Sequence, residues 1–201
     1  MATVARISRD TRARRQGHAG AIIWLTGLSG AGKSTLATAA EAQLFEEGYS
    51  VYVLDGDELR RGISADLGFS ARDRHENVRR AGEVAALLAD AGLVVLVALI
   101  SPFASDRDAA RRVGGSCFRE VFVKASVRTC EGRDPRGLYR RARAGEIPEF
   151  TGVSSPYEPP VTPDLIIDTE QIDVPTAVSQ LVSFITECVP RTAHASTAPA
   201  R

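Results

Sequence analysis

The sequence predicts an α/β protein with three layers, in which helices cover both faces of a parallel β-sheet. Two observations lead to this fold class. Short apolar runs alternate with segments of helical periodicity, which is the pattern of successive β-α-β units. The run at residues 93–100 is apolar at every position, as expected for a strand that is covered on both sides.

The predicted elements follow one another through residues 21–189, and no internal repeat is found. Five apolar runs are the expected strands: residues 21–26, 50–54, 93–100, 119–124 and 164–167. Five segments are the expected helices: residues 33–47, 73–91, 105–113, 135–144 and 175–188. In the second helix apolar residues recur at i, i+3, i+4 and i+7, and Gly92 ends it. We expect residues 93–100 to form a central strand.

Length and composition favour one soluble domain. A chain of 201 residues is typical of a single domain, and no run of about 20 apolar residues could span a bilayer. Acidic and basic side chains number 25 each, so the overall charge gives no reason to expect a nucleic acid or a membrane as partner. The three cysteines are widely spaced, which favours reduced thiols in the cytoplasm.

The two ends of the chain differ from its middle. Residues 1–20 contain five arginines and one acidic residue, and we interpret them as a flexible basic tail. A transit peptide is the alternative, because such peptides are rich in arginine and poor in acidic residues, although their apolar helical face is weak here. Residues 190–201 are small, polar and contain prolines, so we expect them to be disordered.

A glycine-rich segment follows the first predicted strand. Residues 27–35 fit the pattern G-x-x-x-x-G-K-[ST] of phosphate-binding loops, and strand, turn and helix come in the required order. Backbone N–H groups of such a loop surround nucleotide phosphates, its lysine reaches the β- and γ-phosphates, and its hydroxyl can bind Mg²⁺. Lys33 is therefore a predicted catalytic residue and Ser34 a predicted metal ligand. The predicted ATP-binding positions of the loop are Gly27, Ser29, Gly30, Ala31, Gly32, Lys33, Ser34 and Thr35.

Two carboxylates flank a glycine at the end of the second predicted strand. Ligands of parallel sheets bind beyond the carboxyl ends of the strands, so Asp55 and Asp57 fall where a site is expected. One of them can hold Mg²⁺ while the other accepts the proton of a substrate hydroxyl. A turn followed by a helix N-cap is the alternative interpretation.

Further along the chain, two aromatic residues lie in glycine-flanked loops. Phe69 and Phe150 are placed in this way, and two such rings can enclose a base. Arg60, Arg74 and Asn77 lie on or near the helices that follow the two aspartates. Taken singly, each arginine is explained as a solvated surface charge and each ring as an anchor of its loop.

The order of these and later motifs is more specific than the phosphate loop alone. The relevant blocks are residues 54–57, 66–70, 79–80, 100–102, 133–135, 137–140, 142–147, 150–152 and 155–158. With them the chain resembles the adenylylsulfate kinase (APS kinase) family from about Ile22 to Thr169. These enzymes phosphorylate the 3′-hydroxyl of adenosine 5′-phosphosulfate (APS) to give 3′-phosphoadenylylsulfate (PAPS). Glu58, Ala104–Ser105 and Arg140–Arg141 depart from the family pattern.

The resemblance implies the nucleotide-kinase type of phosphate-loop fold, a kinase of sulfate activation that uses ATP with Mg²⁺, and a homodimer. It implies that Asp57 faces the 3′-hydroxyl, that Asp55 lies nearer the metal, and that Arg133 packs on the adenine of ATP. Residues 139–156 would form a mobile lid. The residues implied for binding APS, with its adenine between the two phenylalanines, are Asp57, Arg60, Phe69, Arg74, Asn77, Ile100, Ser101 and Phe150.

Two other interpretations remain open from the residues themselves. A phosphate loop with two aspartates also serves kinases that act on nucleosides or antibiotics. The second interpretation is a regulatory switch that binds a nucleotide without turning it over. It lacks support because neither lysine of the chain is followed by x-Asp, as the guanine-binding signature of GTPases requires.

Overall fold

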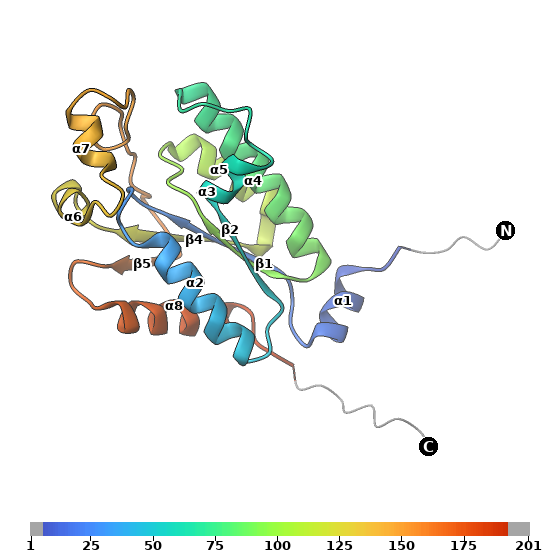
Figure 1. Cartoon of the computed structure of the whole chain (residues 1–201). Helices are drawn as coiled ribbons and strands as arrows, with labels where there is room; N and C mark the ends of the chain where they lie inside the picture. The colour runs from blue at the N-terminus through green and yellow to red at the C-terminus, as the bar shows by residue number, and fades with distance from the viewer. Residues whose placement is uncertain (1–5, 193–201) are drawn as a thin grey trace, which may run out of the picture.

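A parallel sheet of five strands forms the centre of the computed structural model, which describes residues 6–192 (Figure 1). The order of the strands in the sheet is β2-β3-β1-β4-β5, and every neighbouring pair is parallel. This confirms the predicted fold class. The strands are β1 (Ala21–Thr26), β2 (Val51–Asp55), β3 (Val94–Ala98), β4 (Phe118–Lys124) and β5 (Leu165–Asp168).

Helices cover both faces of the sheet. In Figure 1, α4 and α5 lie on one side of it, and α2 and α8 lie on the other. The helices of the described residues are α1 (Arg9–Gln16), α2 (Lys33–Glu46), α3 (Gly56–Arg61), α4 (Ala71–Ala91), α5 (Ala104–Gly114), α6 (Val127–Arg133), α7 (Leu138–Arg143) and α8 (Val174–Cys188), with a 3-10 turn at η1 (Gly115–Cys117). No helix among them is both long and apolar enough to cross a membrane.

The side chains of β1 show how one strand serves two cores. Ile23 and Leu25 belong to the core under α2 and α8, whereas Ile22 and Trp24 belong to the core under α4 and α5. This alternation follows from the two-residue period of a strand. Because both cores are apolar, all six residues of β1 are buried. The strand therefore fixes the position of the glycine-rich segment that follows it.

The strand after α4 is interior, as predicted, but shorter than predicted. β3 lies between β2 and β1 and is buried at each of its five positions. It ends at Ala98, whereas the prediction extended to residue 100. The backbone leaves the sheet there and turns at Ser101, which has a positive φ angle of 39°.

Helix prediction was wrong in three short regions. Residues 135–144 were expected to be helical, but α7 begins only at Leu138, because Gly137 has a φ angle of 64° and cannot continue a right-handed helix. α6 was not predicted, nor was α3. Six or seven residues are too few to show a helical period.

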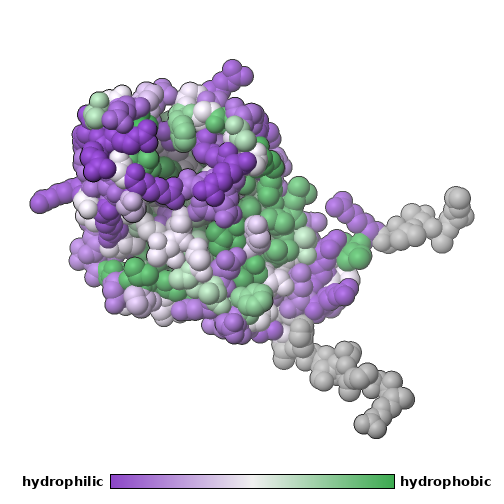
Figure 2. All heavy atoms as spheres, viewed as in Figure 1, coloured by the Kyte–Doolittle hydropathy of each residue, from purple (hydrophilic) through white to green (hydrophobic). Residues whose placement is uncertain are grey.

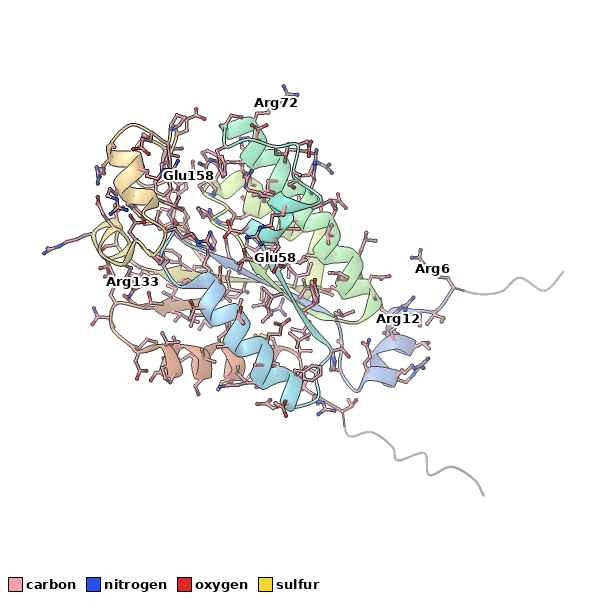
Figure 3. All side chains as sticks on the ribbon, viewed as in Figure 1. Arg6, Arg12, Glu58, Arg72, Arg133 and Glu158 are labelled. Carbon is pink, nitrogen blue, oxygen red and sulfur yellow. The ribbon has the colours of Figure 1, made fainter. Side chains whose placement is uncertain are left out.

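The N-terminal segment contains a helix that the sequence analysis did not predict. Ser8 caps α1 by accepting a hydrogen bond from the Thr11 N–H, and Arg9 pairs with Asp90 on α4 at 2.6 Å. Within the segment that we interpreted as a flexible basic tail, residues 9–16 thus form a helix that packs beside α4. In Figure 3, Arg6 and Arg12 lie beside α1, far from the labelled Arg133 and Glu158. Residues 1–5 and 193–201 lie outside the described part, and with them most of the tail expected at 190–201.

Strand β2 lies at one edge of the sheet, where no strand of residues 6–192 pairs with its outer backbone groups. The N–H group of Val53 donates instead to Glu41 Oε1 on α2, at 3.0 Å. A side chain thus occupies the hydrogen-bonding position of an additional strand.

Candidate active site

A cleft of about 1140 Å³ opens at the carboxyl ends of the strands. Figure 2 shows the hollow near the top of the view, with hydrophilic residues around it. The loops after β1, β2 and β3 form one part of its lining, and the segment around α7 forms another. Of the residues assigned to the site from the sequence, all but Gly27 line this cleft.

Gly27 has a different role that is visible in the backbone. Its φ angle is 151°, and a Cβ atom at this position would lie 2.3 Å from the carbonyl oxygen of Val123 on β4. Only glycine permits so close an approach of two main chains. The approach places the following residues, up to the start of α2 at Lys33, beneath the cleft. The free N–H groups at the start of a helix favour an anion there.

Lys33 lies within the curve of this loop. Its Nζ donates to the carbonyl oxygens of Gly27 and Leu28, both at 2.8 Å, and its side chain is buried. Burial lowers the pKa of Lys33 to about 8, although the nearby carboxylates of Asp55 and Asp57 oppose the shift. An anionic ligand in the loop would favour the protonated form further.

Asp55 has two hydrogen-bonding roles at once. Its Oδ1 accepts the N–H of Asp57 at 2.8 Å and so caps α3, while its Oδ2 accepts the Ser34 hydroxyl at 2.6 Å. The helix N-cap considered in the sequence analysis therefore exists, and the capping residue is Asp55. Capping fixes the carboxylate beside the phosphate loop instead of removing it from the cleft.

Asp57 is contacted by a residue that the sequence analysis missed. Nη1 of Arg136 pairs with Asp57 Oδ2 across the cleft. Arg136 lies between α6 and α7, and between the family blocks 133–135 and 137–140. No local pattern singled out Arg136, because its contact with Asp57 depends on tertiary packing.

Arg74 joins the two loops that carry the aromatic residues. Its Nε donates to the carbonyl of Phe69 at 2.9 Å, and its Nη2 donates to the carbonyl of Glu149 at 2.7 Å. The guanidinium of Arg60 lies 4.4 Å from the centre of the Phe69 ring. The arginines thus bring cationic groups to this end of the cleft.

The two phenylalanines differ in their surroundings. Phe69 is 56% exposed, whereas Phe150 is 7% exposed and packs edge-on against Tyr139 at a ring distance of 5.0 Å. The Tyr139 hydroxyl in turn donates to the carbonyl of Ser29 in the phosphate loop, at 2.9 Å. One ring is therefore held inside the protein, and the other is more than half exposed beside the Arg60 guanidinium.

Ser101 is buried in the part of the cleft that follows β3. Its Oγ accepts the indole N–H of Trp24 at 3.0 Å and lies 3.4 Å from the carbonyl of Leu99. Asn77 is also buried there, and its Oδ1 has no hydrogen-bond partner among residues 6–192. Buried amide oxygens are nearly always hydrogen-bonded, so this atom is available to a ligand.

Arg133 is bound to the loop after β5. Its guanidinium donates to Thr169 through the hydroxyl oxygen at 3.0 Å and the carbonyl oxygen at 2.6 Å. Thr169 lines the cleft and was not predicted as a site residue. It directly follows β5, so the rule that sites lie beyond the carboxyl ends of strands could have found it.

Comparison with known proteins agrees with this geometry. The model of the adenylylsulphate kinase family matches residues 19–168. The chain belongs to the adenylylsulphate kinase family. An adenylyl-sulfate kinase of Shewanella amazonensis is 56% identical over 180 residues, which are 89% of this chain and 91% of that protein. A probable adenylyl-sulfate kinase of Halalkalibacterium halodurans is 54% identical over 182 residues, 90% of each chain.

A solved structure is similar over the same region. The APS kinase of Mycobacterium tuberculosis, in complex with AMPPNP and APS, superposes with a TM-score of 0.80 at 49% identity. The alignment covers 83% of this chain and 98% of that one. The fold of this member of the adenylylsulphate kinase family therefore matches that of a solved relative over most of both chains.

The protein groups beside the phosphate loop fit a magnesium–nucleotide complex. Within residues 6–192 no group of three His, Cys, Asp or Glu side chains could hold a metal ion alone. Ser34 and Asp55 instead present two adjacent oxygen atoms at the loop. Mg²⁺ in kinases is held by one or two protein oxygens together with phosphate oxygens and water, so such a pair is sufficient.

Proposed function

We propose that the protein transfers the γ-phosphoryl group of ATP to the 3′-hydroxyl of APS, giving ADP and PAPS. The observation that supports this most directly is the cleft. It brings a phosphate loop, two carboxylates and a group of arginines with two aromatic rings together, in a member of the adenylylsulphate kinase family. The solved relative that carries both AMPPNP and APS supports the choice of the two substrates.

On the donor side, the phosphate loop holds ATP. The N–H groups of residues 27–35 surround its phosphates, and Lys33 leaves the carbonyls of its own loop to bind the β- and γ-phosphate oxygens. Arg133 packs on the adenine of ATP. Ser34 and Asp55 hold Mg²⁺, which when bound neutralises charge on the phosphates.

On the acceptor side, the adenine of APS stacks on Phe69 and Phe150. Arg60 and Arg74 bind its phosphosulfate group, because guanidinium groups offer planar pairs of donors to phosphate oxygens. Asn77 offers its unpaired Oδ1 to a ribose hydroxyl. Ile100 and Ser101 line the remaining wall.

The reaction itself is an in-line displacement. The 3′-oxygen of APS forms a bond to the γ-phosphorus while the bond from this phosphorus to the bridging oxygen of ADP breaks. The proton of the 3′-hydroxyl passes to Asp57. Lys33 and Arg136 are the protein cations placed to stabilise the negative charge on the transferring group.

A comparison of acceptors tests the proposal. ADP release from Mg²⁺–ATP is measured alone, with APS, and with unmodified nucleosides, and the product is identified by mass spectrometry. We expect APS to stimulate ADP release and to gain one phosphoryl group. Stimulation by a nucleoside but not by APS would assign the protein to another group of small-molecule kinases.

A homodimer in the cytoplasm is part of the same proposal and rests on the family resemblance. Light scattering of the purified protein tests the assembly. A mass of one chain at micromolar concentration would contradict the dimer.

A further inference from the structure

The loop that follows β3 carries Ser101 into the cleft in a strained conformation. Its φ angle of 39° lies in the left-handed region, which residues other than glycine, asparagine and aspartate rarely adopt. Ser101 is also 2% exposed, so protein groups surround it. A conformation of this kind persists only where neighbouring groups hold it.

Arg107 on α5 is one of these groups. Its Nη1 donates to the carbonyl oxygen of Ser101 at 2.8 Å, and its side chain is buried. Trp24 and Thr26 add neutral hydrogen bonds, to Ser101 Oγ at 3.0 Å and to the carbonyl of Ile100 at 2.7 Å. The donor in Arg107 is a charged guanidinium, and hydrogen bonds from charged donors are roughly twice as strong as those between neutral groups.

The same guanidinium binds the chain two residues beyond the proposed lid. Nη2 of Arg107 donates to the carbonyl of Glu158 at 2.8 Å. The Glu158 N–H donates to the carbonyl of Pro102 at 2.8 Å, and its carboxylate accepts the Ala104 N–H at 2.7 Å. Arg107 therefore links the loop after β3 to the chain just beyond residue 156.

Glu120 on β4 balances the buried charge. Its Oε1 accepts from Nε of Arg107 at 2.7 Å, and its Oε2 lies 3.4 Å from Arg111, one turn further along α5. Arg111 also pairs with Asp164 at 3.0 Å and is 37% exposed. Among the described residues it has no hydrogen bond to Ser101 or Glu158, which makes it a natural control.

We infer that Arg107 is a positioning residue for the acceptor substrate: it fixes the backbone of Ser101 and, at Glu158, the chain that follows the lid, and so the shape of the APS pocket. The inference rests on the proposed function. Arg107 does not line the cleft itself, so it acts through these two residues. It has no hydrogen bond to the phosphate loop or to Arg133, so the ATP side should not depend on it.

Arg107→Lys is the main test. A lysine keeps the charge beside Glu120, but a single ammonium group cannot reproduce the planar set of donors that reaches three acceptors. We expect the KM for APS to rise about tenfold, the effect of losing one hydrogen bond from a charged donor. The KM for ATP should stay within about twofold of the parent value, a smaller change than the loss of one such hydrogen bond would cause. Arg111→Lys, the matched control, should leave both KM values unchanged.

Restoring the backbone conformation of Ser101 tests whether Arg107 affects APS binding through that residue. Glycine adopts a positive φ angle without steric cost, so adding Ser101→Gly to Arg107→Lys should recover part of the APS affinity. Ser101→Ala in the same background removes the same hydroxyl but keeps the steric restriction, and it should recover none. If Arg107 had a purely structural role, the two double variants would have the same KM for APS.

A second variant covers the case in which Arg107→Lys does not fold. Arg107→Met with Glu120→Gln leaves no unpaired buried carboxylate, and Glu120→Gln alone is its control. The same rise in the KM for APS over this control is expected. An unchanged KM for APS in folded Arg107 variants would overturn the inference, as would equal rises for ATP and APS. A parent enzyme inactive on APS would refute the proposed function instead.

Discussion

The guanidinium of Arg136 pairs with the carboxylate of Asp57 across the mouth of the cleft. The pair joins the turn before α7 to the start of α3, two segments that are far apart in the sequence. Both side chains are about half exposed, so the contact adds little to the stability of the fold. Its importance is chemical, because it places a cation beside the carboxylate that we assign to the 3′-hydroxyl.

Replacing that carboxylate should affect the rate more than the affinity. Asp57→Asn keeps the shape of the side chain but cannot accept a proton, so we expect kcat to fall by about 10²-fold or more. The KM for APS should change much less. Glu58 provides a control, because it is exposed on the same helix and does not line the cleft. Glu58→Gln therefore removes a neighbouring charge at a position outside the site. An unchanged kcat in Asp57→Asn would move the role to Asp55.

The two lysines of the chain allow a matched test of the phosphate loop. Lys33→Ala removes the fixed charge at the β- and γ-phosphates and should cost about 3 kcal/mol, or 10²- to 10³-fold in kcat. Lys124→Ala removes an exposed lysine that pairs with Asp168 outside the loop, and it should be nearly silent. Steady-state rates of both proteins are compared. Activity of Lys33→Ala within a few-fold of the parent would exclude the phosphate-loop mechanism.

These residues also show what could be predicted from the sequence. Lys33 belongs to a contiguous motif, and β1 begins and ends at the predicted residues because its apolar run is continuous. Arg136 and Arg107 could not be found in this way. Whether a side chain from a short turn or a helix reaches a distant carbonyl or carboxylate depends on tertiary packing, which no local pattern encodes.

Ser101→Ala should leave substantial turnover. Direct in-line transfer needs no phosphoserine, and Ser101 Oγ is already bound by the Trp24 indole. The variant should be less stable by about 1–3 kcal/mol, because that buried N–H loses its acceptor. Thermal unfolding and kcat are measured together. Isolation of a chemically competent phosphorylated Ser101 would contradict direct transfer.

Residues 139–156 should become resistant to trypsin when both substrates' sites are filled. Arg140, Arg141 and Arg143 are exposed on α7, so the free protein should be cut there early. APS together with ADP should protect them, because the adenine of APS adds a stacking partner to Phe150. Arg14 and Arg15 on α1 are the internal control, since they lie far from the cleft. Equal cleavage of α7 with and without ligands would show that it is not part of a lid.

The stability of the fold should fall as the pH decreases below about 6.5. His18 Nε2 accepts the N–H of Ser50 at 2.9 Å, which requires an unprotonated nitrogen, and burial lowers the pKa of His18. The unfolded chain therefore takes up its proton first, so the full contribution is present above pH 6.5 and is lost progressively below it. Urea unfolding at a series of pH values measures this. His18→Gln should flatten the curve between about pH 5.5 and 7. An equally steep curve in His18→Gln and the parent would assign the loss of stability at low pH to other groups.

The hydrogen bond from Val53 to Glu41 has a consequence for how copies of the chain meet. An open edge strand invites the strand of another molecule, which leads to sheet extension and aggregation. Here a carboxylate already occupies one of the outward positions of β2, and an approaching backbone would have to displace it. Self-association through a continuous sheet is therefore disfavoured at this edge. An assembly built there from side-chain contacts instead would leave the order of the strands, and with it the cleft, the same in each copy.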